Sequence, residues 1–237
     1  GETTMHPDFF ELIFWTRKNF PSSKILLLSN GRIFSYKEFT QKLLSIDNLT
    51  LQIPFLGSNG EMHDGITNAF NSFNETRDGI LNIMDQKNET HHLEIRIVLT
   101  KKNISFLGDI MDFVKKDFGG GDSLVILFPL VLGSCRANFD NIGLKYGRAM
   151  KTIQSAVAAR IGEFKDLRLY HFPLCQLDRS LWPYTYRSLV SKIIHFSPKC
   201  GDCRYRRHCL GIPKHYFEVM GDEEFNPILK DMNVEED

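Results

Sequence analysis

The sequence predicts an α/β fold, because short apolar strands alternate with amphipathic helices along most of the chain. The strands are expected at residues 25–28, 49–56, 93–99, 124–130 and 167–172. Such alternation is typical of a parallel sheet whose strands are joined by right-handed helical crossovers. We therefore expect an open or closed α/β barrel over residues 1–172, with polar side chains gathering where the strands end.

The helices between these strands are indicated by apolar residues at helical spacing. They are expected to begin near Pro7, Ser35 and Ser72, and to cover residues 106–118 and 146–161. Pro7 suits the first turn of a helix, and Ser72 followed by Glu75 matches a capping box. The alternation stops at Pro173, where a cysteine-rich appendix over residues 173–237 begins with a further helix expected at 185–195.

Composition narrows the classes of partner and compartment. The 237 residues contain 29 Lys and Arg and 29 Asp and Glu, so no net charge attracts nucleic acid or an anionic membrane. No apolar run approaches the roughly 20 residues that span a bilayer. No secretion signal is visible, and clustered cysteines then favour a reducing compartment. We expect a cytoplasmic protein with no nucleic-acid or membrane partner.

Four of the five cysteines indicate a metal site near the C-terminus. Cys200, Cys203 and Cys209 are spaced C-x2-C-x5-C, and Cys175 lies upstream. Four thiolates can hold either a tetrahedral zinc ion or an iron–sulfur cubane. Free thiols or a disulfide are the simpler interpretation, although random placement rarely gives this spacing. The basic neighbours are expected to favour the thiolate form; they are Lys199, Arg204, Arg206 and Arg207.

Histidines offer further candidates. His195 and His208 could complete a zinc site with the three clustered cysteines, which is the main rival to an iron–sulfur cluster. His63 and Asp64 could be a base and its orienting carboxylate, but adjacent polar residues at the start of a helix are more often caps. The pair His91 and His92 precedes a strand and is expected in an exposed loop.

Several strand-end motifs resemble radical S-adenosylmethionine enzymes. Residues 1–13, which begin Gly1-Glu2-Thr3, resemble that family's G-G-E-P motif and the helix after it. Residues 28–31 resemble its T-N-G turn, residues 51–57 its fourth strand, and residues 98–103 the end of its fifth strand. The resemblance covers nearly the whole chain, with the motifs in the family's order.

This resemblance implies a fold and a cofactor pocket. The fold would be a partial (β/α)6 TIM-like barrel lacking its first strand, followed by the small cysteine-rich appendix. Glu2, with Gly1 and Thr3 beside it, would hold the methionine amino group of S-adenosylmethionine. Ser29, Asn30, Gln52 and Ser58 would face the same cofactor from the strand ends.

The C-terminal part resembles radical enzymes with an auxiliary iron–sulfur site, and peptide-modifying maturases of the His-Xaa-Ser type are the nearest comparison. The resemblance implies that Cys175, Cys200, Cys203 and Cys209 hold an auxiliary [4Fe-4S] cluster. It also implies a peptide or protein substrate, and a reductant such as a flavodoxin or ferredoxin.

The sequence departs from the family at its defining feature. The C-x3-C-x2-C loop that binds the cluster cleaving S-adenosylmethionine is absent, Cys135 is isolated, and Thr3 stands where proline is usual. We therefore expect the C-terminal part of a longer radical enzyme. The alternative is a catalytically inactive, zinc-stabilised binding module derived from such a barrel.

Overall fold

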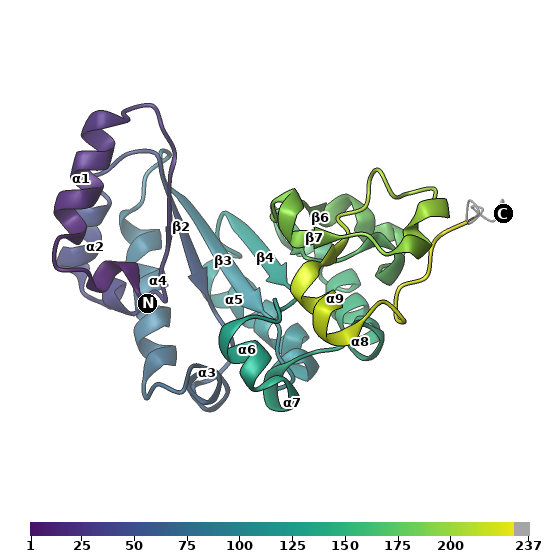
Figure 1. Cartoon of the computed structure of the whole chain (residues 1–237). Helices are drawn as coiled ribbons and strands as arrows, with labels where there is room; N and C mark the ends of the chain where they lie inside the picture. Colours follow the sequence, from purple (N-terminus) through teal and green to yellow (C-terminus); the bar gives the residue numbers. More distant parts are fainter. Residues whose placement is uncertain (230–237) are drawn as a thin grey trace. The chain divides into compact units, whose positions relative to one another are not determined.

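A computed structural model describes residues 1–229 and confirms the α/β fold (Figure 1). Six strands form one parallel sheet in which their spatial order follows their order in the chain. The strands are β1 (Ile25–Leu28), β2 (Leu49–Pro54), β3 (His92–Val98), β4 (Ser123–Leu127), β5 (Leu167–Tyr170) and β6 (Thr185–Tyr186). The sheet is open, so it does not close into a barrel.

Five of the helices, α1, α2, α4, α5 and α8, lie where the apolar periodicity predicts helices, whereas α3, α6, α7 and α9 were not predicted. α1 (Phe9–Asn19) precedes the first strand, and the helices between the strands are α2 (Lys37–Leu43), α3 (Gly60–Thr67), α4 (Ser72–Gln86), α5 (Leu107–Phe118), α6 (Gly133–Ala137), α7 (Phe139–Ile142) and α8 (Tyr146–Ala158). A last helix, α9 (Lys214–Met220), follows the cysteines. No helix in residues 1–229 has the length and apolar character needed to cross a membrane.

The chain forms two compact units. The N-terminal unit comprises Gly1–Val98, Ser105–Ile126 and Arg160–Leu167. The C-terminal unit comprises Leu99–Ile104, Leu127–Ala159 and the described residues from Arg168 to Leu229. Each has its own set of buried side chains, and they are described separately below.

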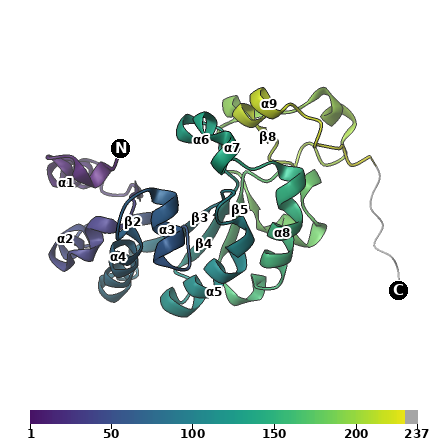
Figure 2. The same ribbon diagram turned by 90° about the horizontal axis from the view of Figure 1, so that it is seen from below.

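The core of the N-terminal unit lies between its strands and the helices on one side of them. Figure 2 shows α2, α4 and α5 along one side of β2, β3 and β4. Phe55, directly after β2, is fully buried among aromatic rings. It stacks on Phe113 at 5.4 Å and meets Phe118 edge-on at 5.2 Å, both from α5. These contacts fix the end of β2, where polar residues were expected.

Helix α4 packs closely against the turn that follows β1. Gly31 in that turn has φ +85°, which a side chain rarely adopts. A Cβ at Gly79 of α4 would lie 2.2 Å from the Gly31 carbonyl oxygen. Glycine is therefore required at both positions, and the contact holds Ser29 and Asn30 at the end of β1.

The helix predicted over residues 185–195 is wrong. This stretch instead contains β6, a 3-10 turn (Ser191–Ile193) and β7 (Ile194–His195). β6 pairs in parallel with β5, and β7 pairs antiparallel with β8 (Ile212–Pro213). The backbone groups of this stretch form hydrogen bonds with strands distant in the sequence instead of within a local helix. This pairing outweighs the helical spacing of the apolar residues.

Candidate functional site

The four cysteines selected by their spacing line one cavity of the C-terminal unit. Cys175 lies in a 3-10 turn (Leu174–Gln176), whereas Cys200 lies in another (Pro198–Asp202). The Cys203 amide donates to the Cys200 carbonyl at 3.3 Å, which closes the C-x2-C turn. Cys209 follows a further turn, since its amide donates to the Tyr205 carbonyl at 2.8 Å. Two separate stretches thus converge on one place.

The rest of the cavity wall is mostly apolar, and backbone amides point at one of the sulfurs. Leu174 and Gly211 each donate an N–H to Cys209 Sγ at 3.4 Å. Such bonds stabilise a thiolate and are found around iron–sulfur clusters. The apolar wall residues are Pro173, Leu174, Phe196, Ile212, Phe225, Pro227 and Ile228. The donor set, its amide bonds and its enclosure fit a metal–sulfur group.

Burial and mutual repulsion oppose ionisation of these thiols. Burial raises the pKa of Cys175 to about 12, and the nearby Cys209, Cys200 and Cys203 add to the rise. Burial is also the main cause of the raised pKa values of Cys200 and Cys209. Arg206 lowers the pKa of Cys200, as expected of a basic neighbour, but burial raises that pKa by more, so the net shift in the metal-free protein is upward. A bound cation would supply the missing stabilisation.

The other candidate ligands lie elsewhere. His195 stacks on Phe217 with ring centroids 3.7 Å apart, and neither His195 nor the exposed His208 lines the cysteine cavity. Cys135 lies apart in α6, as its isolation in the sequence predicts. Within residues 1–229, no three His, Cys, Asp or Glu side chains are grouped closely enough to hold a single metal ion.

In the N-terminal unit, the expected cofactor-binding residues meet at the ends of β1 and β2. Glu2 Oε2 accepts the Asn30 amide at 2.7 Å, and its Oε1 accepts both the amide and the hydroxyl of Thr4, at 3.2 and 2.7 Å. The Ser29 amide donates to the Gln52 carbonyl at 3.2 Å. The Gly-Glu segment, the Asn-Gly turn and the end of β2 are thus physically connected.

Three of the expected cofactor-binding residues take no part in these bonds. Gly1 and exposed Thr3 line a second cavity, between α1 and β1, which Glu2 also lines. Ser58 is half-buried in the loop between β2 and α3, without a hydrogen bond to the residues at the ends of β1 and β2. The structure therefore brings Glu2, Ser29, Asn30 and Gln52 together.

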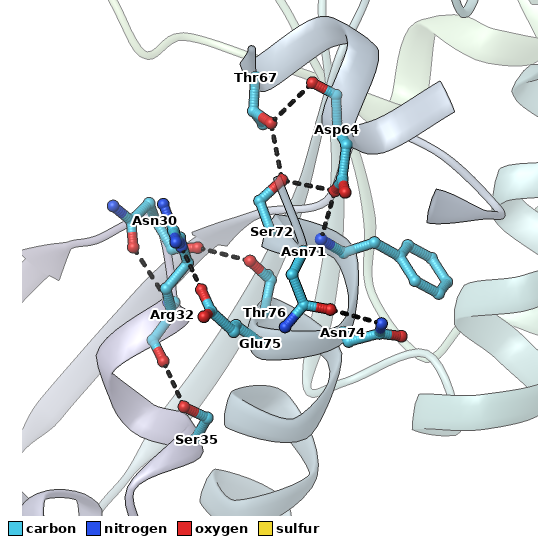
Figure 3. Close-up of polar contacts among 12 residues, drawn as sticks. Asn30, Arg32, Ser35, Asp64, Thr67, Asn71, Ser72, Asn74, Glu75 and Thr76 are labelled. Atoms are coloured by element: carbon cyan, nitrogen blue, oxygen red, sulfur yellow. Dashed lines mark hydrogen bonds and ion pairs between the residues drawn. The ribbon is translucent and has the colours of Figure 1, made fainter. Parts of the chain in front are cut away.

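Sequence reasoning missed the ion pair beside these residues. Arg32 Nε lies 2.5 Å from Glu75 Oε2, and Thr76 Oγ1 donates to the Asn30 carbonyl at 3.0 Å (Figure 3). Arg32 and Glu75 line a cavity of about 430 Å³ that Glu2 and Asn30 also line. The only sequence signal was a charged residue directly after the Asn-Gly turn.

Asp64 serves as a helix cap, and His63 is buried beside it. Asp64 Oδ1 accepts the Ser72 hydroxyl at 2.8 Å and the Phe73 amide at 2.7 Å, so it caps α4 from outside that helix (Figure 3). The predicted Ser72 capping box does not form, because Ser72 is already the first residue of α4. Burial lowers the pKa of His63 to about 4, against the opposing effect of Asp64. A side chain 2% exposed cannot reach a substrate as a base.

The expectation that His91 and His92 lie in an exposed loop is wrong. His91 is 5% exposed, and its Nε2 donates to the Ile46 carbonyl at 3.1 Å. His92 begins β3, half-buried, with Nε2 2.7 Å from Ser123 Oγ. Both rings satisfy polar groups of the N-terminal unit and thus have a structural role.

Comparison with known proteins assigns this chain to no family. No protein-family model and no curated protein sequence matches the chain. The functional argument therefore rests on the cavity of thiols and on the residues gathered at the ends of β1 and β2.

Proposed function

We propose that this chain holds a [4Fe-4S] cluster through Cys175, Cys200, Cys203 and Cys209. The single observation that carries the proposal is that thiols from two separate stretches line one cavity. Four cysteines provide one ligand for each iron of a cubane. The apolar walls and the amides that donate to Cys209 Sγ support a cluster over a zinc ion. The absence of both candidate histidines from the cavity wall supports an all-thiolate site.

We further propose that the chain works within a radical S-adenosylmethionine enzyme acting on a peptide or protein in the cytoplasm. The cluster would be auxiliary, because the sequence has no C-x3-C-x2-C. When bound, it supplies an electron-transfer centre, and a flavodoxin or ferredoxin would be its reductant. The residues of this chain fix the sulfurs, exclude water with apolar walls and bond one sulfur through amides.

The residues at the ends of β1 and β2 support a pocket for S-adenosylmethionine. Glu2 keeps its carboxylate in the wall of the 430 Å³ cavity through bonds to Asn30 and Thr4. A carboxylate has about four acceptor sites, so Glu2 can still accept bonds from a ligand ammonium group. Arg32, paired with Glu75, places a cation at the same cavity.

Metal reconstitution of the full chain tests the proposal. After anaerobic treatment with iron and sulfide, we expect about four irons and four sulfides per chain and a broad visible absorbance. Cys203→Ser should lose most of this metal because it removes one cavity ligand. Cys135→Ser is the matched control, since Cys135 lies outside the cavity, and it should bind as much metal as the wild type.

Two outcomes contradict the proposal. A colourless protein with one zinc ion per chain would favour the zinc-stabilised binding module. Equal metal content in wild type and Cys203→Ser would show that the cavity thiols do not share a metal. Binding of S-adenosylmethionine, measured by calorimetry on wild type and Glu2→Gln, tests the pocket separately, with Glu11→Gln at an exposed position of α1 as the control.

A further inference from the structure

The backbone adopts an unusual conformation at His171, shortly before Cys175. His171 directly follows β5 and has φ +71°. The other non-glycine residues with positive φ in residues 1–229 are all asparagines, which tolerate this region best. A buried histidine in this conformation is disfavoured unless its surroundings hold it there.

Two hydrogen bonds hold His171 in place, and their partners are two residues, Phe128 and Tyr146, whose rings stack on each other. Its Nδ1 donates to the Phe128 carbonyl at 2.7 Å, and its own carbonyl accepts the Tyr146 hydroxyl at 2.6 Å. The Phe128 and Tyr146 rings are stacked, with centroids 3.7 Å apart and planes 10° from parallel. The end of β5 is thus tied to α8 and to the residue after β4.

Tyr146 is itself fixed. It is fully buried as the first residue of α8, and its amide donates to the Tyr216 hydroxyl at 3.2 Å. Tyr216 donates in turn to Glu224, which also accepts the Gly147 amide at 2.9 Å. Burial raises the pKa of Tyr146 well above its usual range, so its hydroxyl keeps the proton that it donates.

The short segment from His171 to Cys175 links the fixed backbone conformation at His171 to the position of Cys175. Phe172 and Leu174 are buried, and Pro173 between them has a restricted φ. The Leu174 amide donates to Cys209 Sγ, so the segment already lies against the cavity. The direction in which the chain leaves His171 therefore decides where the Cys175 thiol lies.

We propose that His171 and Tyr146 are positioning residues for Cys175, holding its thiol at the metal cavity by fixing the left-handed turn after β5. The inference rests on the proposed function, because Cys175 is taken as a metal ligand. Neither residue touches the metal in this arrangement, and each acts through the backbone.

Alkylation of the metal-free full chain tests the positioning. A short pulse of iodoacetamide followed by mass spectrometry gives the labelling rate of Cys175 relative to Cys200, which lies in a different turn. Tyr146→Phe should raise this ratio roughly fivefold, the effect of losing one buried hydrogen bond. His171→Ala should raise it roughly tenfold or more, because the backbone preference and a hydrogen bond are both lost.

Three further variants separate positioning from general destabilisation. His171→Asn keeps a residue that accepts positive φ and an amide donor for the Phe128 carbonyl, so its ratio should stay near wild type. His171→Gly keeps only the backbone freedom and should be intermediate. His195→Ala, which truncates a half-buried ring not bonded to Cys175, should leave the ratio unchanged.

The metal-loaded protein gives a second readout. If Cys175 is mispositioned, one iron loses its ligand, and the reconstituted His171→Ala protein should show a [3Fe-4S] signal in electron paramagnetic resonance. Unchanged labelling ratios in Tyr146→Phe and His171→Ala would overturn the inference, as would an equal rise in His195→Ala. Failure of the wild type to bind iron would refute the cluster, whereas the metal-free labelling would still decide the positioning.

Discussion

At the scale of single residues, burial rather than neighbouring charge sets the protonation state of two candidate reactive side chains, His63 and Cys200. Burial outweighs Asp64 at His63 and outweighs Arg206 at Cys200. His63 and Cys200 were selected as candidates because of the residues next to them, and the sequence shows such neighbours directly. Depth below the surface is set by packing, so the direction of the pKa shifts was available only from the structure.

His63 should make stability depend on pH in a defined window. Its pKa in the folded protein is about 4, below the ordinary value of 6.5, so the unfolded chain takes up the proton first as pH falls. The stabilisation is fully present above pH 6.5 and is lost as pH falls toward 4. We expect a loss of roughly 2–3 kcal/mol in the free energy of unfolding across this window.

Urea unfolding at a series of pH values measures this dependence. His63→Gln should flatten the curve between pH 4 and 6.5, whereas His6→Gln, at an exposed position, should leave it as in wild type. A wild-type curve that is already flat in this window would contradict the buried, neutral state of His63.

Residue spacing predicted site residues where they lie close together in the sequence, and it did not predict them where they lie far apart. The C-x2-C-x5-C pattern identified three cavity residues, and Cys175 was added as a fourth, upstream thiol, which the family resemblance also implied. The pairing of Arg32 with Glu75 was not predicted, because the two residues are 43 positions apart and Glu75 was assigned only to the Ser72 capping box. Only the packing of α4 against the turn after β1 brings this pair together.

At the scale of elements, the strands and main helices were predicted because their apolar periodicity is strong. The ends were less well predicted: the strand expected over residues 49–56 stops at Pro54, and the one over 124–130 stops at Leu127. The prediction of a helix over residues 185–195 failed because the structure of this stretch depends on strand partners at Leu169–Tyr170 and Ile212–Pro213. Pairing between distant segments is not encoded in local spacing.

The contact between α4 and the turn after β1 should be sensitive to a single methyl group. A Cβ at Gly79 would approach the Gly31 carbonyl oxygen to 2.2 Å, so Gly79→Ala must displace the helix or the turn. We expect a loss of about 2 kcal/mol in the free energy of unfolding. Weaker binding of S-adenosylmethionine should accompany it, since Asn30 and Arg32 lie in or beside that turn.

Gly65→Ala is the matched control for this prediction. Gly65 lies within α3, and a Cβ there meets nothing within 4 Å. Because alanine favours helix over glycine, this variant should gain about 0.5–1 kcal/mol. A Gly79→Ala protein as stable as wild type would show that α4 and the turn are not in close contact in solution.

At the scale of the whole molecule, the division into two units predicts which part of the chain metal binding will stabilise. The four cysteines all belong to the C-terminal unit, and binding free energy at such a site is folding free energy of the segments that carry the ligands. Hydrogen exchange measured with and without reconstituted metal should therefore show increased protection in residues 173–213. Exchange in β1, β2 and β3 should change little.

Cys203→Ser provides the control, because metal treatment of this variant should leave the exchange pattern unaltered. Equal protection of β1–β3 and of residues 173–213 would contradict a metal effect confined to the C-terminal unit.

The sequence alone determined the α/β class, the positions of most strands and helices, and the cysteines of the C-x2-C-x5-C cluster. These follow from local periodicity and short spacing, which act within a few residues. Tertiary structure decided that the sheet stays open, that Cys175 reaches the other thiols, and that Glu2 binds the turn at Asn30. It decided them because each depends on contacts between segments far apart in the chain, whose free energy comes from packing and burial.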